Sequence, residues 1–277
     1  MNDPTPPATR NEMETVTSAD GTPIAFERTG SGPPLVLVHG GACDHRFWEL
    51  GDVRLALADH CTVYAMDCRG IGESGDADQY ELDREFEDVA AVVDAIDEPV
   101  ILLGHSSGAL LSLEAALRTD NLHKLILYEP PIPVHDHDLY DDAVLTEMER
   151  LLDAGENEQV LVTFLQKIAR STPEEVEEQR AAPYWQALVD AAHVWPRSLR
   201  SIGAYEFDAA RFESMSTPTL LLSGSQSPPF LRDVTSPIND VLPNSRVTTF
   251  DGHGHEAMLT APERFVNEVL AFIRVPN

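Results

Sequence analysis

Short, continuous runs of apolar and β-branched residues alternate along this chain with segments of helical length. Such a run predicts a strand buried on both faces, and strand–helix alternation predicts a mostly parallel, doubly wound α/β sheet. The predicted strands cover residues 35–38, 62–66, 100–103, 125–128, 220–222 and 247–250. The predicted helices of the sheet layers cover residues 46–58, 81–96, 107–118, 231–241 and 261–273.

The rhythm of strands and helices is interrupted once. Between residues 132 and 215 helical patterns replace the buried strands, and an insertion of that length is too long for a loop. We therefore expect a helical cap over the carboxyl edge of the sheet. Before the first buried strand, residues 14–18 and 23–28 flank an Asp-Gly turn and predict a β-hairpin. The expected organisation is a loose tail at 1–12, a core at 13–131 and 216–277, and a cap at 132–215.

The charge of the chain excludes several classes of function. The 277 residues include 47 acidic and 19 basic side chains, which gives a formal net charge of −28. Such a surface repels nucleic acid and anionic lipid, so we expect neither a nucleic-acid partner nor a membrane-surface role. Lysine occurs only at Lys124 and Lys167. This acidic, lysine-poor composition resembles that of proteins from salt-accumulating halophiles, and the alternative is compositional drift in a mesophilic protein.

Cysteine usage and hydropathy bear on the compartment. Cys43, Cys61 and Cys68 are an odd number in a chain too large to need disulfide staples, which favours a reducing environment. Residues 1–28 contain no apolar core of a secretory signal, and no stretch approaches the roughly 18 apolar residues of a membrane span. We expect a soluble, cytoplasmic protein of undetermined oligomeric state.

The most informative motif is Gly104-His105-Ser106-Ser107-Gly108, which directly follows a predicted strand and opens a predicted helix. A serine on a tight strand-to-helix turn is lifted clear of the sheet, and the flanking glycines permit the sharp backbone. The motif therefore predicts a nucleophile at Ser106. The backbone N–H of Ser107, at the start of the helix, is expected to face the reacting atom.

Two further segments carry the remaining chemistry. His39-Gly40-Gly41 ends the first buried strand, where small residues let the N–H of Gly41 approach a developing oxyanion together with that of Ser107. Near the carboxyl end, the segment Gly-His-Gly-His over residues 252–255 offers His253 or His255 as the general base.

These elements resemble the α/β-hydrolase superfamily. The loop Asp-Cys-Arg-Gly-Ile-Gly-Glu-Ser over residues 67–74 and the pair Phe47-Trp48 add to the resemblance. It implies the α/β-hydrolase fold with a helical cap insertion and a triad in the chain order nucleophile, acid, histidine.

Within the resemblance, Gly254-His255 followed by Glu-Ala-Met matches the family's histidine loop, so His255 is favoured over His253. Trp48 and His105 are candidates for substrate contacts. His105 and His39 are expected as structural neighbours of the site rather than as bases.

The triad acid departs from the family's pattern. The family places an aspartate after the strand at 220–222, but here the loop reads Gly-Ser-Gln-Ser-Pro. Glu129, at the end of the preceding strand, is the expected replacement, because some α/β-hydrolases, including haloalkane dehalogenases, carry their acid there. Asp233 and a serine–histidine dyad without an acid remain alternatives.

The resulting prediction is a cofactor-independent serine hydrolase that cleaves small or medium carboxylic esters through an acyl-enzyme. A C–C bond hydrolase or enol-lactonase with the same triad is one alternative, and a ligand-binding protein with weak turnover is another. No metal is expected: the His-Asp-His-Asp run at 135–138 is interpreted as a solvated acidic loop. The charges at 81–87 are interpreted as a solvated helix face, and Tyr184, Trp185 and Trp195 as pocket or cap-core aromatics.

Overall fold

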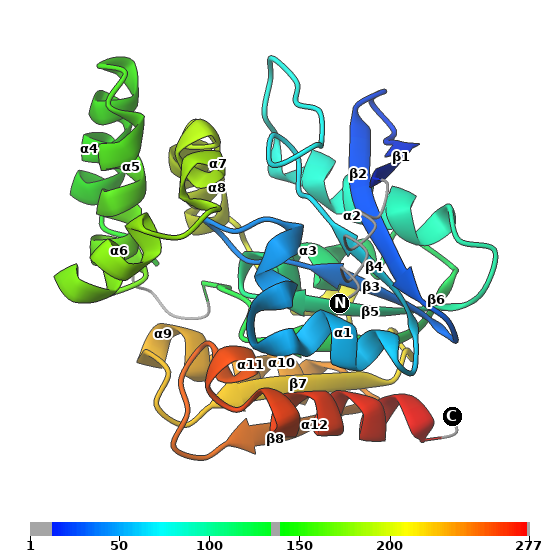
Figure 1. Ribbon diagram of the computed structural model, residues 1–277. Helices are drawn as coiled ribbons and strands as arrows, with labels where there is room; N and C mark the ends of the chain where they lie inside the picture. Colours follow the sequence, from blue (N-terminus) through cyan, green and yellow to red (C-terminus); the bar gives the residue numbers. More distant parts are fainter. Residues whose placement is uncertain (1–12, 134–138, 276–277) are drawn as a thin grey trace, which may run out of the picture.

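The structure, a computed structural model, describes residues 13–133 and 139–275 and is built around one eight-stranded sheet (Figure 1). The strand order is β1-β2-β4-β3-β5-β6-β7-β8. Strands β3 to β8 are parallel, and the hairpin β1–β2 pairs antiparallel with β4 at one edge. The predicted doubly wound α/β fold is therefore confirmed. The strands are β1 Met13–Thr17, β2 Pro23–Gly30, β3 Pro34–Val38, β4 Thr62–Met66, β5 Val100–His105, β6 Leu122–Tyr128, β7 Thr219–Gly224 and β8 Ser245–Phe250.

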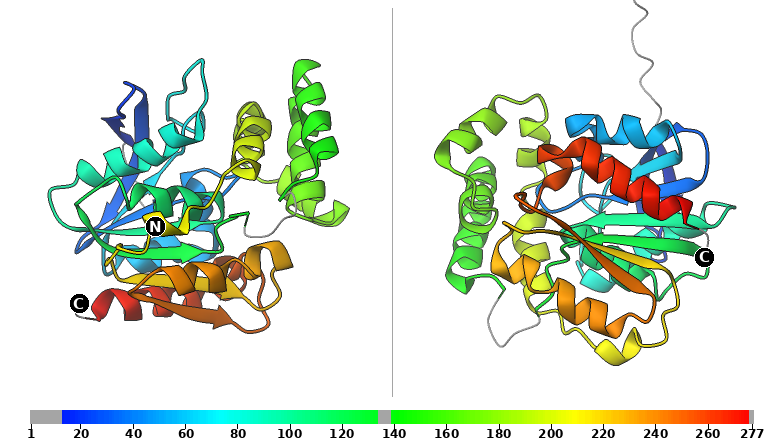
Figure 2. Two further views of the ribbon diagram at one scale, coloured as in Figure 1. Left: turned by 180° about the vertical axis from the view of Figure 1, so that it is seen from behind. Right: turned by 90° about the horizontal axis from the view of Figure 1, so that it is seen from below.

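Both faces of the sheet are covered by helices (Figures 1 and 2). Within β3, Leu35 and Leu37 pack with the helices of one face, and Val36 and Val38 with those of the other. Burial on both sides explains why the strand sequence is continuously apolar. The first face carries α1 Val53–Ala58, α11 Ala257–Thr260 and α12 Pro262–Arg274; the second carries α2 Leu82–Asp94, α3 Ser107–Ala115, α9 Pro229–Arg232 and α10 Thr235–Val241.

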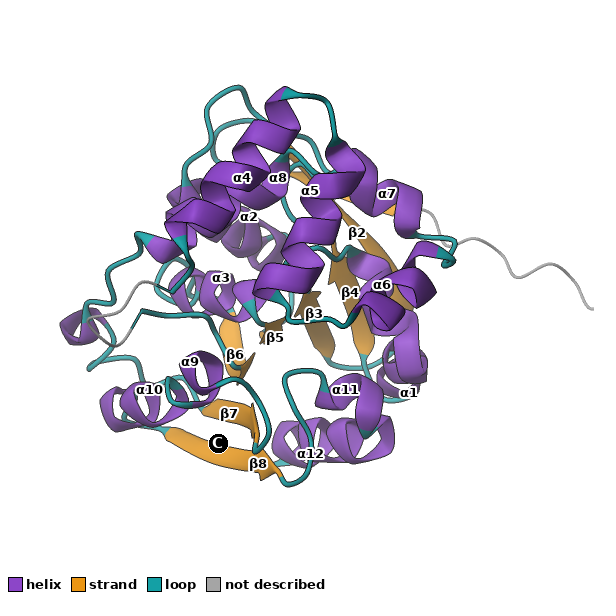
Figure 3. Cartoon of the chain, turned by 90° about the vertical axis from the view of Figure 1, so that its left-hand side faces the viewer, coloured by secondary structure: helices purple, strands orange, loops and turns teal. Residues whose placement is uncertain are grey.

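Between β6 and β7 the described residues form five α-helices that lie over the carboxyl edge of the sheet (Figure 3). Glu114 of α3, fully buried, anchors the segment that returns from these helices, because it accepts hydrogen bonds from Tyr205 and Arg211, each at 2.7 Å. Asp76, in the β4–α2 loop, accepts from Arg197 at 2.8 Å. The five are α4 Asp142–Asp153, α5 Asn157–Thr163, α6 Pro173–Arg180, α7 Trp185–Asp190 and α8 Val194–Gly203.

The helix boundaries depart from the sequence prediction where the backbone breaks. The predicted helix at 46–58 is a 3-10 segment, His45–Asp52, followed by α1, because Gly51 and Asp52 adopt positive φ of 66° and 56°. The predicted helix at 231–241 is likewise divided into α9 and α10, and α5 continues into a π-helical turn over Phe164–Ile168. In the described part of the chain, no helix combines the length and the hydropathy that a membrane span requires.

Candidate active site

Ser106 occupies a sharp turn between β5 and α3. Its backbone is strained, with φ 54° and ψ −125°. The flanking glycines make this turn possible by close approach: a Cβ on Gly104 would lie 2.3 Å from the carbonyl oxygen of Gly108, and one on Gly108 would lie 2.3 Å from that of His39. The predicted strand–turn–helix context of Ser106 is therefore present, and the residue lines a cavity at the end of the sheet.

The glycines after β3 lie directly beside Ser106. A Cβ added to Gly40 would come within 3.1 Å of the Ser106 Cβ, and one added to Gly41 within 3.9 Å of the Ser107 Oγ. The N–H of Ser107 is the first of α3 and has no acceptor within the helix. The two loops predicted to supply oxyanion donors are thus adjacent to the predicted nucleophile.

Glu129 and His255 form a buried hydrogen-bonded pair. Glu129 Oε2 accepts from His255 Nδ1 at 2.7 Å, and the carboxylate is fully buried. Its other oxygen, Oε1, accepts from the Ser223 hydroxyl at 2.9 Å and from the Gly224 N–H at 2.7 Å. Hydrogen bonds that favour the ionised carboxylate offset the cost of burying it. Because Nδ1 is occupied, Nε2 is the ring nitrogen left for a serine hydroxyl.

His255 and Ser106 line the same cavity. No hydrogen bond joins the Ser106 hydroxyl to the His255 ring in this conformation; such bonds often tighten only when substrate binds. The competing histidine, His253, is half-buried, and its Nδ1 lies 2.9 Å from the Thr260 hydroxyl. Among the described residues, the geometry therefore groups Ser106 with His255 and not with His253.

The loop after β7, where the family's aspartate is absent, holds the histidine loop through its backbone. A Cβ on Gly224 would lie 2.3 Å from the Gly254 carbonyl oxygen, so only glycine permits this approach. Ser225 Oγ accepts from the Gly252 N–H at 2.9 Å. The alternative acid, Asp233, is exposed and paired with Arg232 at 3.1 Å. The loop after β7 therefore supports the histidine loop, and the carboxylate that contacts His255 is that of Glu129 at the end of β6.

The remaining predicted site residues have structural contacts. His105 lines the cavity but is almost fully buried, and its Nε2 donates to the His255 carbonyl at 3.0 Å. Burial lowers the pKa of His105 well below its usual value, so the ring is neutral. Trp48 is fully buried in the core against His105 and Phe265 and does not line the cavity. Its expected contact with substrate is contradicted, because its ring packs in the hydrophobic core between the sheet and the helices α1 and α12.

His39 fixes the start of the oxyanion loop. Its Nδ1 donates to the Gly40 carbonyl at 2.8 Å, and its Nε2 accepts from the Cys68 N–H at 3.1 Å. Burial lowers the pKa of His39, so that this neutral tautomer is maintained. His39 is therefore a structural neighbour, as the sequence suggested, and not a base.

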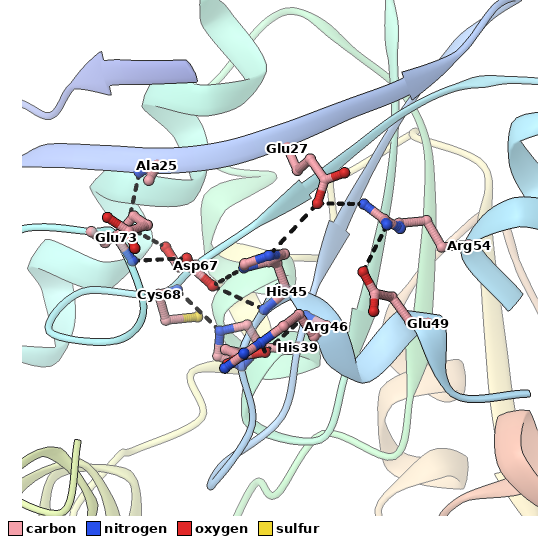
Figure 4. Close-up of polar contacts among 12 residues, drawn as sticks. Ala25, Glu27, His39, His45, Arg46, Glu49, Arg54, Asp67, Cys68 and Glu73 are labelled. Carbon is pink, nitrogen blue, oxygen red and sulfur yellow. Dashed lines mark hydrogen bonds and ion pairs between the residues drawn. The ribbon is translucent and has the colours of Figure 1, made fainter. Parts of the chain in front are cut away.

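A network of charged residues secures the far side of the same loop (Figure 4). The fully buried carboxylate of Asp67 accepts from the N–H and from the ring Nδ1 of His45, at 2.9 and 2.8 Å. His45 also lies 3.7 Å from Glu27 of β2, which pairs with Arg54 of α1 at 2.7 Å. Burial favours the neutral form of His45, but its contacts with Asp67 outweigh burial and raise its pKa.

The cavity itself has a volume of about 960 Å³ including its open mouth. Its walls come from the loops just described and from α3, α8 and the π-helical turn. None of the described residues that line it is a lysine or an arginine. In the described chain no cluster of histidine, cysteine or carboxylate side chains is suited to a metal, and the run at 135–138 lies outside the described residues.

A family model for the alpha/beta hydrolase family matches residues 35–268, and the chain belongs to this family. The superfamily resemblance inferred from the motifs is thereby confirmed. The chain is similar to a solved alpha/beta hydrolase from Sphaerobacter thermophilus, with a TM-score of 0.81 and 36% identity, covering 94% of this chain and 100% of the other.

Two curated relatives differ in the substrate that their names give. One is a 2-hydroxy-6-oxo-6-(2'-aminophenyl)hexa-2,4-dienoic acid hydrolase of Metapseudomonas resinovorans, 24% identical and covering 94% of this chain and 91% of the relative. The other is a pimeloyl-[acyl-carrier protein] methyl ester esterase of Aeromonas hydrophila, 26% identical and covering 90% of this chain and 99% of the relative. The protein is a hydrolase of this family.

Proposed function

We propose that the protein is a serine hydrolase that cleaves uncharged carboxylic esters of small or medium size. The observation that carries the proposal is the fully buried Glu129 carboxylate bonded to His255 at 2.7 Å, in a cavity that Ser106 shares. A carboxylate that fixes the histidine tautomer and stabilises the imidazolium is what activation of a serine hydroxyl requires.

The proposed reaction proceeds in two stages. Ser106 Oγ attacks the ester carbonyl carbon while His255 Nε2 takes the hydroxyl proton, and the N–H groups of Gly41 and Ser107 donate to the oxyanion. The imidazolium then gives its proton to the alkoxide oxygen, the C–O bond breaks and the alcohol leaves. Water attacks the acyl-enzyme as His255 removes its proton, and the same proton returns to Ser106 as the acid is released.

The charges around the cavity favour an uncharged ester over an acidic substrate. Its walls carry two carboxylates, Glu85 and Glu256, and no lysine or arginine among the described residues. At the adjoining mouth, Arg170 is accompanied by Glu175 and Glu178. A substrate such as the dienoic acid of the first relative would bring a buried carboxylate without a cationic partner, which is costly.

The test is a substrate screen of the wild type and Ser106→Ala. We expect the wild type to hydrolyse neutral short-chain esters and to turn over a dienoate, assayed in parallel, only slowly. In Ser106→Ala the kcat for the esters should fall by at least about 10⁴-fold. A fluorophosphonate probe should label the wild type at Ser106. Faster turnover of the dienoate would favour the C–C hydrolase, and absence of labelling would favour a binding protein.

A further inference from the structure

Glu85, in the first turn of α2, is a buried acid that the proposed mechanism does not use. Its side chain lines the cavity and the residue is only 4% exposed. One carboxylate oxygen, Oε1, accepts from the Tyr80 hydroxyl at 2.5 Å. Arg197 and Arg69 attract the carboxylate electrostatically, but among the described residues neither forms a salt bridge with it. Burial raises the pKa of Glu85 to about 7. The interpretation of residues 81–87 as a solvated helix face is therefore wrong at this position.

One face of α8 forms another wall of the cavity. Trp195, Ser198, Leu199 and Ile202 line the cavity at the i, i+3, i+4 and i+7 spacing of a single helix face. Tyr80, whose hydroxyl donates to Glu85, also packs against Arg197 of α8, whose guanidinium lies 4.7 Å from the ring centroid. Tyr80 therefore connects α8 to Glu85 of α2.

Trp195 adds a donor to the same wall. Its indole Nε1 is buried and has no acceptor among the described residues. Trp195 precedes Ser198 by three residues, which is about 4.5 Å along the axis of α8. This end of the cavity therefore combines a buried acceptor with an unused donor.

The chemistry of this wall selects among substrate groups. A carboxylate would be repelled by ionised Glu85 and would have no lysine or arginine partner in the described lining. An ammonium group would pair with Glu85 but could not accept from the Trp195 N–H. A hydroxyl group both donates and accepts, so it satisfies Glu85 in either protonation state and Trp195 as well.

The orientation of the ester in the cavity follows from the difference in burial between the two ends of the cavity. Glu85, Leu111 and Ile202 at this end are all buried, whereas Glu256 at the mouth is exposed. The alcohol must depart before water attacks, so it belongs on the mouth side, and the acyl part, which stays on Ser106, belongs at the closed end.

We propose, on the basis of the esterase activity proposed above, that Glu85 and Trp195 form a subsite for a hydroxyl group on the acyl chain of the ester.

The experiment compares matched nitrophenyl esters whose straight acyl chains of four to eight carbons end in methyl, hydroxyl or carboxylate. Each is assayed at pH 8 with the wild type, Glu85→Leu, Glu85→Gln and Glu87→Gln. Glu87 is on the same helix but pairs outward with Arg84 at 2.7 Å, so Glu87→Gln is the matched control. Melting temperatures establish that each variant is folded.

We expect the kcat/KM of the wild type to be at least about tenfold higher for the hydroxyl ester than for the methyl ester at one chain length. A site that hydrogen-bonds a substrate hydroxyl leaves buried polar groups unpaired when that hydroxyl is missing. In Glu85→Leu this ratio should fall to about one. In Glu85→Gln, turnover of the carboxylate ester relative to the methyl ester should rise at least about fivefold, because the repulsion is removed. A gain of this kind does not arise from misfolding.

The outcomes separate the two proposals. Ester turnover that depends on Ser106 but has the same hydroxyl-to-methyl ratio in the wild type and Glu85→Leu would overturn the subsite and leave the esterase intact. A preference for hydroxyl groups on the alcohol part, measured with a matched series of butanoate esters, would overturn its placement on the acyl side. Absence of Ser106-dependent turnover of any ester would overturn both.

Discussion

At the scale of single residues, backbone strain is concentrated where the proposed chemistry occurs. Ser106 and Glu129 both have positive φ, at 54° and 45°, a conformation that costs a non-glycine residue about 1–3 kcal/mol. Hydrogen bonds hold both in place: the Ser106 N–H donates to Tyr128 O at 2.9 Å and the Glu129 N–H to Leu222 O at 3.2 Å. The sheet thus fixes the serine and the acid before substrate arrives.

The role proposed for Glu129 is tested by Glu129→Gln. The amide oxygen retains the donors Ser223 and Gly224, but the amide nitrogen then donates to His255 Nδ1 and places the ring proton on Nε2. A histidine in that tautomer cannot accept the serine proton. We expect kcat to fall about 10⁴-fold, as for the corresponding change in a serine protease triad, with little change in melting temperature.

Asp233→Asn is the matched control for this prediction, since Asp233 is exposed and pairs with Arg232. Its kcat should stay within about twofold of the wild type. If Glu129→Gln kept near-normal turnover while Asp233→Asn lost it, the acid would have been assigned to the wrong strand end. Equal retention in both variants would favour a dyad without an acid.

At the scale of elements, the contacts of His45 hold four segments together. His45 begins the 3-10 segment after the oxyanion loop, Asp67 follows β4, Glu27 belongs to β2 and Arg54 to α1 (Figure 4). A protonated His45 attracts the carboxylates of Asp67 and Glu27, while its neutral form keeps only hydrogen bonds. The position of the oxyanion loop is therefore linked to the protonation of His45.

This linkage predicts a pH dependence with a definite sign. The folded pKa of His45 is raised above its ordinary value of 6.5, so its contribution is fully present below pH 6.5 and is lost as pH rises through the folded pKa. The unfolding free energy of the wild type relative to His45→Gln should thus decrease between pH 6 and 9.

Urea denaturation at each pH measures this difference, and His60→Gln, at an exposed histidine, is the control. The control should change stability by less than about 0.5 kcal/mol at every pH. A His45→Gln difference that stayed constant or grew with pH would contradict the linkage.

The elements differ in how far the sequence alone predicts them. The parallel strands were predictable because burial on both faces demands unbroken apolar runs such as that of β3. Helix ends were less predictable, because Gly51 and Asp52, in the left-handed conformation, interrupt a pattern that reads as one continuous helix. This break depends on tertiary contacts that local periodicity does not encode.

The residues of the candidate site also differ in how far the sequence alone predicts them. The turn at Ser106 was predictable from its place between a strand and a helix, and the Glu129–His255 hydrogen bond agrees with the acid that the family resemblance suggested. Trp48 was misassigned and Glu85 was missed, because a sequence does not reveal which side of a loop or helix meets the cap. The periodicity of α2 could have indicated Glu85, since it lies four residues before the buried Val89.

At the scale of the whole molecule, acidic residues cannot all be paired. With 47 acidic and 19 basic side chains, 28 carboxylates remain in excess even if every basic residue pairs with one of them. Arginines such as Arg69 and Arg211 are already engaged with buried acids. The excess charge therefore repels itself across the surface and destabilises the compact state at low ionic strength.

A high salt concentration should reduce this repulsion, because the Debye length falls from about 10 Å at an ionic strength of 0.1 M to about 3 Å at 1 M. We expect the melting temperature to rise as KCl is raised from 0.1 M, with most of the increase complete by about 1 M, where screening of exposed charges is nearly full. Sucrose at matched osmolality is the control, since it stabilises by exclusion from the surface without screening charge. A melting temperature that stayed flat or fell in KCl, or that rose equally in sucrose, would show that the net charge of −28 does not limit stability.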